Sequence, residues 1–396
     1  MKNRRSVVLA GGATAFSLLG DQALYAVLPT YYEALGFLPI QVGILLAANR
    51  FIRIFTNHWA ERLCHRIPPS QLLCWALSIG ALLSICYALL PLFSIFLVAR
   101  LLWGICWSFI RQINMMTVAE NIEPGQMGRY MGLFSVLSRL GSVSGNFVGA
   151  LGHDLIGFTG ILLVFALISG IAIPLGPLSR RNLPSLPEPH SQEASGQRAG
   201  AGLLYSAFIL GLVGQGMIMS TLGLLLKEVV GDGFGFAGVY VGVATLTGTL
   251  MSSRWILDLS APLLGAMSDW VGRRWGGLVF FAAGAIALGL AALGSELVWL
   301  GGAVVLFFLC ATGAGVVLTA EAGVRGSRAV ASYATALDAG ACIGPVLAWS
   351  LPELALPTAW IFVVGAIGYL TAGIIGAFSF DTKENRYPNS DGGGRR

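Results

Sequence analysis

Nine charged side chains lie inside apolar stretches of the sequence, where a charge is expensive to bury. They are six arginines and three aspartates: Arg50, Arg53, Arg100, Arg111, Arg139 and Arg254, with Asp21, Asp258 and Asp338. Because a charge at the centre of a bilayer costs at least about 2.5 kcal/mol on the most lenient scale, each one needs a partner or a hydrated cavity. We predict that they border a binding site, and the surplus of positive charge favours an anionic or zwitterionic ligand.

One face of a helix expected over 93–116 combines cations with aromatic rings. Arg100, Trp103, Trp107, Arg111 and Asn114 fall within roughly 60° of one another at 100° per residue. Such a face can pair with a flat anion and stack on it. For Arg111, nearer the end of the segment, a role in setting topology is an equal alternative. The full set of residues predicted to bind substrate is Tyr25, Arg50, Arg100, Trp103, Trp107, Arg139, Gln215 and Arg254.

Asp21 shares a face of the first apolar segment with Thr14, Ser17 and Tyr25. We interpret it as a proton carrier, because the protonation of a carboxyl group responds both to burial and to the distance of a nearby arginine. The alternative is a permanent ion pair with Arg50 or Arg53 of the next segment.

Two further aspartates are candidates for proton coupling, Asp258 and Asp338. Arg254 and Asp258 lie one helical turn apart, so simple neutralisation of this pair is the competing interpretation.

Composition decides the fold class. Apolar residues make up 56% of the 396 residues and charged residues only 11%, which is too little charge to cover a soluble globule. A hydrocarbon core takes about 20 apolar residues per helix, and residues 357–380 contain no charge at all. Proline, glycine and charge clusters divide the chain into twelve predicted spans: 6–29, 38–60, 71–91, 93–116, 128–150, 157–178, 203–227, 236–262, 275–294, 297–319, 329–351 and 357–380.

The chain therefore reads as an all-α membrane protein with two six-helix bundles. We expect these bundles at 1–178 and 203–380, a cytoplasmic linker rich in proline, glycine and serine at 179–202, and a disordered cytoplasmic tail at 381–396. With both termini in the cytoplasm, the basic residues of the loops fall on the cytoplasmic side and only Lys227 falls outside. We expect a multi-pass protein of a bacterial inner membrane, and a monomer.

An internal repeat supports the division into halves. The decapeptides NHWAERLCHR at 57–66 and GAMSDWVGRR at 265–274 follow corresponding spans, and Arg129 and Gly141 align with Arg328 and Gly340. In membranes, duplicated units are used to rock one half against the other around a central site.

The second decapeptide resembles the loop signature Gly-x-x-x-Asp-x-x-Gly-Arg-Arg of the major facilitator superfamily, and the first copy departs from it at Asn57, Glu61 and Cys64. The resemblance implies two pseudo-symmetric bundles, alternating access, and a charged latch that holds the outward-open state. The matching latch residues are Glu61, Arg62, Glu120, Arg129, Asp269, Arg273, Glu321 and Arg328. The alternative is that these charges only set topology.

Two shorter strings bear on the direction of transport. Gly141-x-x-x-Gly145-Asn146-x-x-Gly149 resembles the family's fifth-helix antiporter signature, with Asn146 where proline is usual, although small residues at this spacing also serve ordinary helix packing. Arg100 resembles the family's fourth-helix arginine, which implies a role in proton movement. The resemblance favours proton-coupled efflux over proton-coupled uptake of an organic anion.

The function predicted from the sequence is secondary active transport of a small anionic or zwitterionic organic solute. The expected partners are that solute, protons and the lipid bilayer. A membrane receptor or assembly factor that lost transport is the second class. An enzyme is disfavoured because no Ser/His/Asp set, nucleotide loop or metal-ligand cluster appears, so we expect no cofactor and no metal site. The arginines are scattered over short loops, which argues against nucleic acid.

Overall fold

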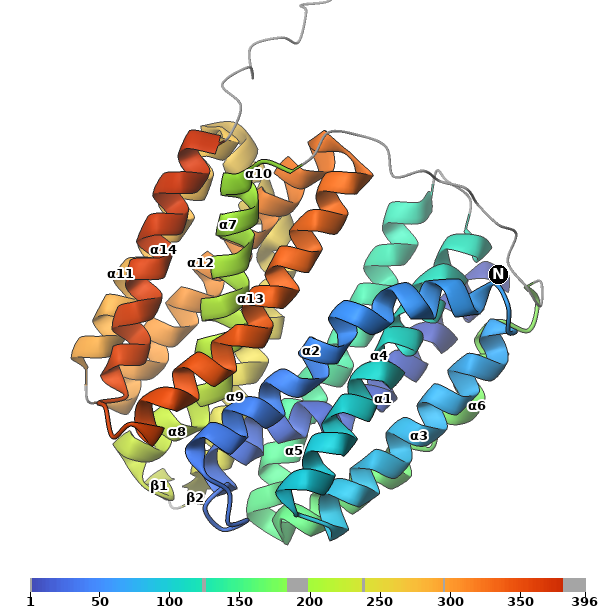
Figure 1. Cartoon of the computed structure of the whole chain (residues 1–396), viewed down its shortest axis with the longest axis horizontal. Helices are drawn as coiled ribbons and strands as arrows, with labels where there is room; N and C mark the ends of the chain where they lie inside the picture. The colour runs from blue at the N-terminus through green and yellow to red at the C-terminus, as the bar shows by residue number, and fades with distance from the viewer. Residues whose placement is uncertain (1, 123–125, 184–198, 237–238, 295, 380–396) are drawn as a thin grey trace, which may run out of the picture.

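The computed structural model describes residues 2–122, 126–183, 199–236, 239–294 and 296–379. The first bundle consists of α1 (Lys2–Tyr31), α2 (Pro39–Cys64), α3 (Pro69–Leu89), α4 (Phe93–Asn121), α5 (Met127–Ser169) and α6 (Ala172–Ser179) (Figure 1). The second consists of α7 (Ala201–Leu210), the π-helix η2 (Gly211–Ile218), α8 (Met219–Val230), the strands β1 (Gly233–Phe236) and β2 (Val239–Gly242), α9 (Val243–Leu257), the 3-10 helix η3 (Asp258–Ser260), α10 (Ala261–Val271), α11 (Arg273–Leu293), α12 (Leu297–Arg325), α13 (Ser327–Glu353) and α14 (Ala359–Ser379).

The predicted all-α membrane fold is confirmed. In the described residues, nine helical segments are long and apolar enough to cross a membrane. α2 and the run α9–η3–α10, which carry several of the intramembrane charges, are not among these segments. The number twelve therefore stays a prediction, as do the exact domain boundaries. The predicted tail at 381–396 lies outside the described residues, as does most of the predicted linker.

One reversal of the chain is hidden inside α5. Gly157 has φ +79° and ψ 171°, which no helix accommodates and which glycine adopts without a Cβ clash. A Cβ added to Gly152 would lie 2.4 Å from Ile161, so the chain folds back on itself across this glycine. The break falls at the first residue of the predicted span 157–178, so the helix before it runs past the predicted end at residue 150.

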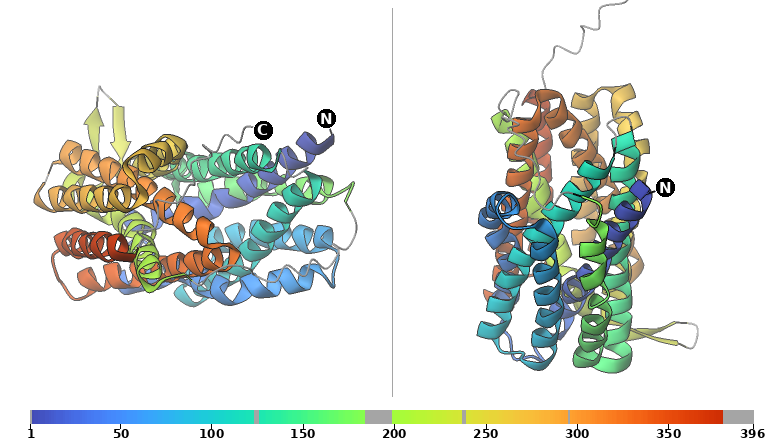
Figure 2. Two further views of the ribbon diagram at one scale, coloured as in Figure 1. Left: turned by 90° about the horizontal axis from the view of Figure 1, so that it is seen from above. Right: turned by 90° about the vertical axis from the view of Figure 1, so that its right-hand side faces the viewer.

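The start of the predicted span 236–262 is wrong, because the chain forms a β-hairpin there before α9 begins at Val243. β1 and β2 pair antiparallel, with Gly233 opposite Gly242 and Phe234 opposite Val241. Glycines weaken a helix, whereas aromatic and β-branched residues favour strands, so this stretch suits a hairpin. The hairpin projects from the helices (Figure 2).

The two ends of the molecule differ. We call the end with the β-hairpin the hairpin end, and the end where α1 begins and α14 ends the terminal end. The bundles meet at the hairpin end and diverge toward the terminal end (Figure 1). Polar contacts join them at the hairpin end, including Lys227 Nζ to Glu33 Oε2 at 2.9 Å, the Ile40 amide to Glu353 Oε2 at 3.1 Å, and the Thr245 amide to Asp154 Oδ2 at 2.9 Å.

Candidate functional site

A cavity of about 550 Å³ lies between α5 of the first bundle and the helices of the second. Much of its wall is small or apolar, with residues such as Leu210, Gly315, Val316 and Leu337. Its polar side chains are Ser135, Arg139, Gln215, Arg254, Asp258, Thr312, Thr319 and Tyr333. A pocket of this size and character is what a small organic ligand requires.

The Asp258 carboxylate is the centre of the charges in this cavity. Its Oδ2 lies 3.0 Å from Nη2 of Arg139, which comes from the first bundle. Its Oδ1 pairs with Nη1 of Arg254, one helical turn earlier on α9, and accepts a hydrogen bond of 3.0 Å from the Thr312 hydroxyl on α12. Asp258 is the first residue of η3, the 3-10 turn that follows α9.

A tryptophan supports both arginines. The guanidinium carbon of Arg139 lies 4.4 Å from the Trp255 ring centroid, and that of Arg254 lies 5.7 Å away. Cations over an indole face are stabilised by the ring quadrupole. Arg139 keeps a side-chain exposure of 43%, against 12% for Arg254, so Arg139 is the cation that a ligand reaches more easily.

The wall beside the charges is a π-helix. η2 contributes Gly214 and Gln215 to the cavity, and its backbone is tightly packed on α13, since a Cβ added to Gly216 would lie 2.6 Å from the Gly344 Cα. Arg50 of α2 donates from Nη1 to the carbonyl oxygens of Gln215 and Ala341, both at 3.3 Å. π-helical turns occur often at functional sites. A cation of one bundle thus binds the backbone of the other beside the cavity.

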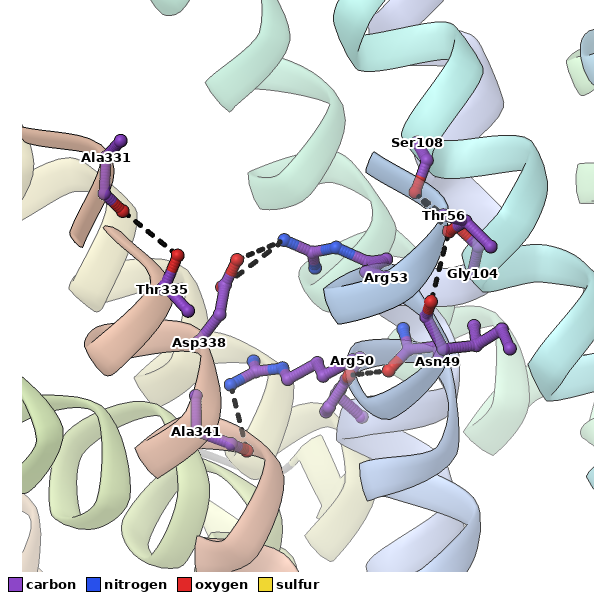
Figure 3. Close-up of polar contacts among 12 residues, drawn as sticks. Asn49, Arg50, Arg53, Thr56, Gly104, Ser108, Ala331, Thr335, Asp338 and Ala341 are labelled. Atoms are coloured by element: carbon purple, nitrogen blue, oxygen red, sulfur yellow. Dashed lines mark hydrogen bonds and ion pairs between the residues drawn. The ribbon is translucent and has the colours of Figure 1, made fainter. Parts of the chain in front are cut away.

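A second charge contact joins the bundles next to Arg50. Figure 3 shows Arg53 of α2 pointing toward Asp338 of α13, with Nη2 at 3.3 Å from Oδ2. Asp338 directly follows Leu337, which lines the cavity. Among the predicted substrate and coupling residues, the structure therefore gathers Arg50, Arg139, Gln215, Arg254, Asp258 and Asp338 at the boundary between the bundles.

The remaining predicted residues lie inside the first bundle, away from the lining of this cavity. Asp21 pairs with Nη1 of Arg100, which is fully buried and also donates to the Leu45 carbonyl oxygen at 3.0 Å and to the Tyr25 hydroxyl at 3.3 Å. Asn49 completes the cluster by accepting from the Tyr25 hydroxyl at 3.2 Å. The partner of Asp21 is thus neither of the arginines proposed as alternatives.

The tryptophans predicted on the same face as Arg100 stack on each other. The ring centroids of Trp103 and Trp107 are 6.3 Å apart, and Trp103 is buried against Gly80. The shared face predicted on this helix exists, but Arg100 and Trp103 turn into the bundle. Their role as substrate contacts stays a prediction.

Four of the eight predicted latch residues form ion pairs, each within one bundle. Arg273 Nη1 lies 3.7 Å from Glu321 Oε2, and its Nε lies 3.8 Å from Asp269 Oδ1. Glu120 pairs at 2.8 Å with Arg180, which directly follows α6 and is not among the predicted latch residues. The side chains of Glu61, Arg62, Arg129 and Arg328 are exposed. The latch role stays a prediction, because here these charges connect helices of one bundle.

Sequence reasoning missed Trp255, Thr312 and Tyr333 as neighbours of the charges. The position of Trp255 next to Arg254 was a usable signal, whereas Thr312 and Tyr333 sit on other helices and carry none. Within the described ranges, no group of three or more His, Cys, Asp or Glu side chains is placed to hold a metal ion.

A helical membrane protein with two bundles around a charged cavity has the build of a secondary transporter. The chain belongs to the Major Facilitator Superfamily, whose sequence profile matches residues 10–324. Members of this family are transporters and not enzymes.

Solved structures share the fold at low identity. The nucleoside transporter NupG has a TM-score of 0.75 and 12% identity over 97% of this chain and 100% of its own. A bacterial homolog of the human lysosomal transporter Spinster, in an inward-facing and unoccupied conformation, has a TM-score of 0.70 and 14% identity over 96% of this chain and 95% of its own. A mutant of the peptide transporter POT in complex with alafosfalin has a TM-score of 0.73 and 13% identity over 96% of this chain and 94% of its own. A search of curated proteins found no match.

Proposed function

We propose that this protein transports an organic anion with an apolar body, binding it in the cavity between α5 and the second bundle. The observation that carries the proposal is the arrangement of Arg139 and Arg254 around Asp258 in a largely apolar wall. Two cations and one carboxylate leave the cavity with one surplus positive charge. A surplus positive charge beside a largely apolar wall attracts an anion.

Alternating access is supported by the asymmetry between the two ends. The polar contacts of Glu33, Ile40 and Asp154 with the second bundle all lie at the hairpin end, while the cavity lies nearer the terminal end. The distribution of basic loop residues supports a cytoplasmic terminal end in a bacterial inner membrane. On this assignment the structure corresponds to an inward-open state. A rocking of the bundles that breaks the hairpin-end contacts would expose the site to the other side.

Proton-coupled export is the direction we propose. Asp21 lies buried against Arg100, and protonation of Asp21 would release that cation to other partners. The glycines of α5 let this helix pack closely on α1, because Cβ atoms added to Gly141 and Gly145 would lie 2.4 and 2.6 Å from atoms of α1. This packing supports the resemblance of α5 to the antiporter signature. We propose a monomer, since the cavity is built from one chain.

The test is a thermal-shift screen of the purified protein with organic monoanions, followed by flux of the strongest binder in proteoliposomes. We expect Arg139→Gln and Arg254→Gln each to weaken binding by about tenfold or more. The control Arg66→Gln removes the same charge from an exposed position near the terminal end and should bind like the wild type.

Three outcomes separate the alternatives. Binding without flux would make the protein a receptor or assembly factor. Wild-type flux in both Arg139→Gln and Arg254→Gln would show that the substrate binds outside this cavity. For direction, a pH gradient that drives protons toward the cytoplasmic side should drive the anion to the opposite side. Accumulation of the anion on the side to which protons flow would indicate uptake.

A further inference from the structure

The Asp258 carboxylate occupies a position that an anionic ligand would be expected to take. It lies between Arg139 of α5 and Arg254 of α9, and it also accepts the Thr312 hydroxyl of α12. A carboxylate needed only to neutralise Arg254 would be satisfied by the contact within one helical turn. Its second oxygen instead reaches across the cavity, to a cation that belongs to the other bundle.

The other charged groups near this position have their own partners or lie elsewhere. α13 presents Tyr333 to the cavity, and that hydroxyl accepts a hydrogen bond of 3.2 Å from Thr319. Asp338 of α13 pairs with Arg53 of α2. Arg111 of α4 is exposed and is not part of the cavity lining. Among the lining residues, the ionised side chains are thus Arg139, Arg254 and Asp258.

We propose that Asp258 sets the valence of the substrate, as a resident anion that leaves room for one further negative charge. A monoanion neutralises the surplus charge of the cavity. A dianion would leave a net negative charge beside the Asp258 carboxylate and a largely apolar wall, which is unfavourable. This proposal rests on the proposed function, because it assigns the selectivity of the same cavity.

The experiment compares two probes with the same carbon count, phenylbutanoate and phenylsuccinate, near neutral pH where they carry one and two carboxylates. Binding constants are measured by calorimetry on the full-length protein. We expect the wild type to prefer phenylbutanoate, and we expect Asp258→Asn to shift the preference ratio by about tenfold or more toward phenylsuccinate.

Matched variants separate a charge effect from a structural one. Asp258→Glu keeps the charge and should keep the wild-type ratio. Asp232→Asn removes a carboxylate from the exposed turn before β1 and should also keep it. The double variant Arg139→Gln with Asp258→Asn leaves Arg254 as the one ionised lining residue, so its ratio should return toward phenylbutanoate. A merely structural role of Asp258 would not produce this return.

A second route avoids Asp258 altogether. Gln215→Lys adds a cation to the same lining and should shift the ratio toward phenylsuccinate even if Asp258→Asn fails to fold. An unchanged ratio in Asp258→Asn, or in Gln215→Lys where the first variant cannot be purified, overturns the role of Asp258 while leaving the anion cavity intact. A wild type that binds neither probe overturns the anion cavity, and the inference falls with it.

Discussion

The Arg53 guanidinium on α2 lies 3.3 Å from the Asp338 carboxylate on α13, measured from Nη2 to Oδ2, and this ion pair joins the two bundles beside the cavity. Both side chains are largely buried, with exposed fractions of 13% and 22%. Loss of one partner would leave the other charge desolvated without compensation, so the pair favours the conformation in which α2 and α13 are close.

We expect Arg53→Gln to reduce the population closed at the hairpin end by about tenfold, because Asp338 then gains by moving into water. Spin labels at Leu38 and Leu354, exposed positions at this end, would report the change as a longer distance. The exchange Arg53→Asp with Asp338→Arg should restore the short distance. Equal distance distributions in wild type and Arg53→Gln would show that the pair does not bias the equilibrium.

A close approach of backbones makes the same end sensitive to side-chain volume. A Cβ added to Gly43 of α2 would lie 2.8 Å from both the Pro345 carbonyl oxygen and the Trp349 Cβ of α13. Gly43→Leu should therefore wedge the hairpin end open and abolish transport, since interiors do not absorb extra volume without movement.

The matched control is Gly289→Leu on α11, where nothing lies within 4 Å of an added Cβ. It should transport like the wild type and keep the short distance between the labels. If Gly43→Leu kept both the distance and the flux, α2 and α13 would have to yield by small shifts, and the bundles would not rock at this contact.

Asp21 and Arg100 form a buried pair for which stability and function have to be separated. Asp21→Asn should lower the free energy of unfolding by about 3–5 kcal/mol, because Arg100 is fully buried and loses its counter-charge. Denaturant unfolding monitored by tryptophan fluorescence would measure the loss. The double variant Asp21→Asn with Arg100→Gln should recover most of it.

If Asp21 carries the proton, the double variant Asp21→Asn with Arg100→Gln should also lose proton coupling. Exchange of substrate across the membrane should persist, while accumulation driven by a pH gradient should be lost. Accumulation at the wild-type rate in a stable double variant would assign the pair to structure alone.

The sequence predicted which residues are charged inside the membrane, but it did not predict their partners. Helical periodicity correctly predicted that Trp103 and Trp107 lie next to each other on one face of α4. Periodicity identifies a face without identifying the helix packed against it, so the partner of Asp21 could not be found from spacing. The pair of Arg254 and Asp258 could be predicted because both residues lie within one helical turn. The contact of Asp258 with Arg139 could not be predicted, because it depends on how the two bundles meet.

The fold was predictable to the extent that composition and glycine patterns specify it. Apolar length alone indicates helices that span a membrane, and Gly157 marks the reversal within α5. The β-hairpin was missed because its apolar residues extend the hydrophobic run of α9, so hydropathy merges the two. Short apolar runs do not distinguish strand from helix by periodicity alone.

Acid should weaken the contact between Glu33 and Lys227 at the hairpin end. The hydrogen bond from Lys227 holds the pKa of Glu33 below its ordinary value of 4.5, while partial burial opposes this effect. Because the pKa is lowered in the folded state, the contribution to closure is fully present above pH 4.5 and is lost as the pH falls through the lowered value. Glu33 is 64% exposed, so the effect is small.

We expect the hairpin-end distance to lengthen in part of the population below about pH 4. The carboxylates of Glu353 and Asp154 also contact the opposite bundle at this end, so the measurement is the difference between the wild type and Glu33→Gln across the pH range. That variant should already show the longer distance in part at neutral pH and respond less to acid, and identical titration curves for the two proteins would remove Glu33 from the gate.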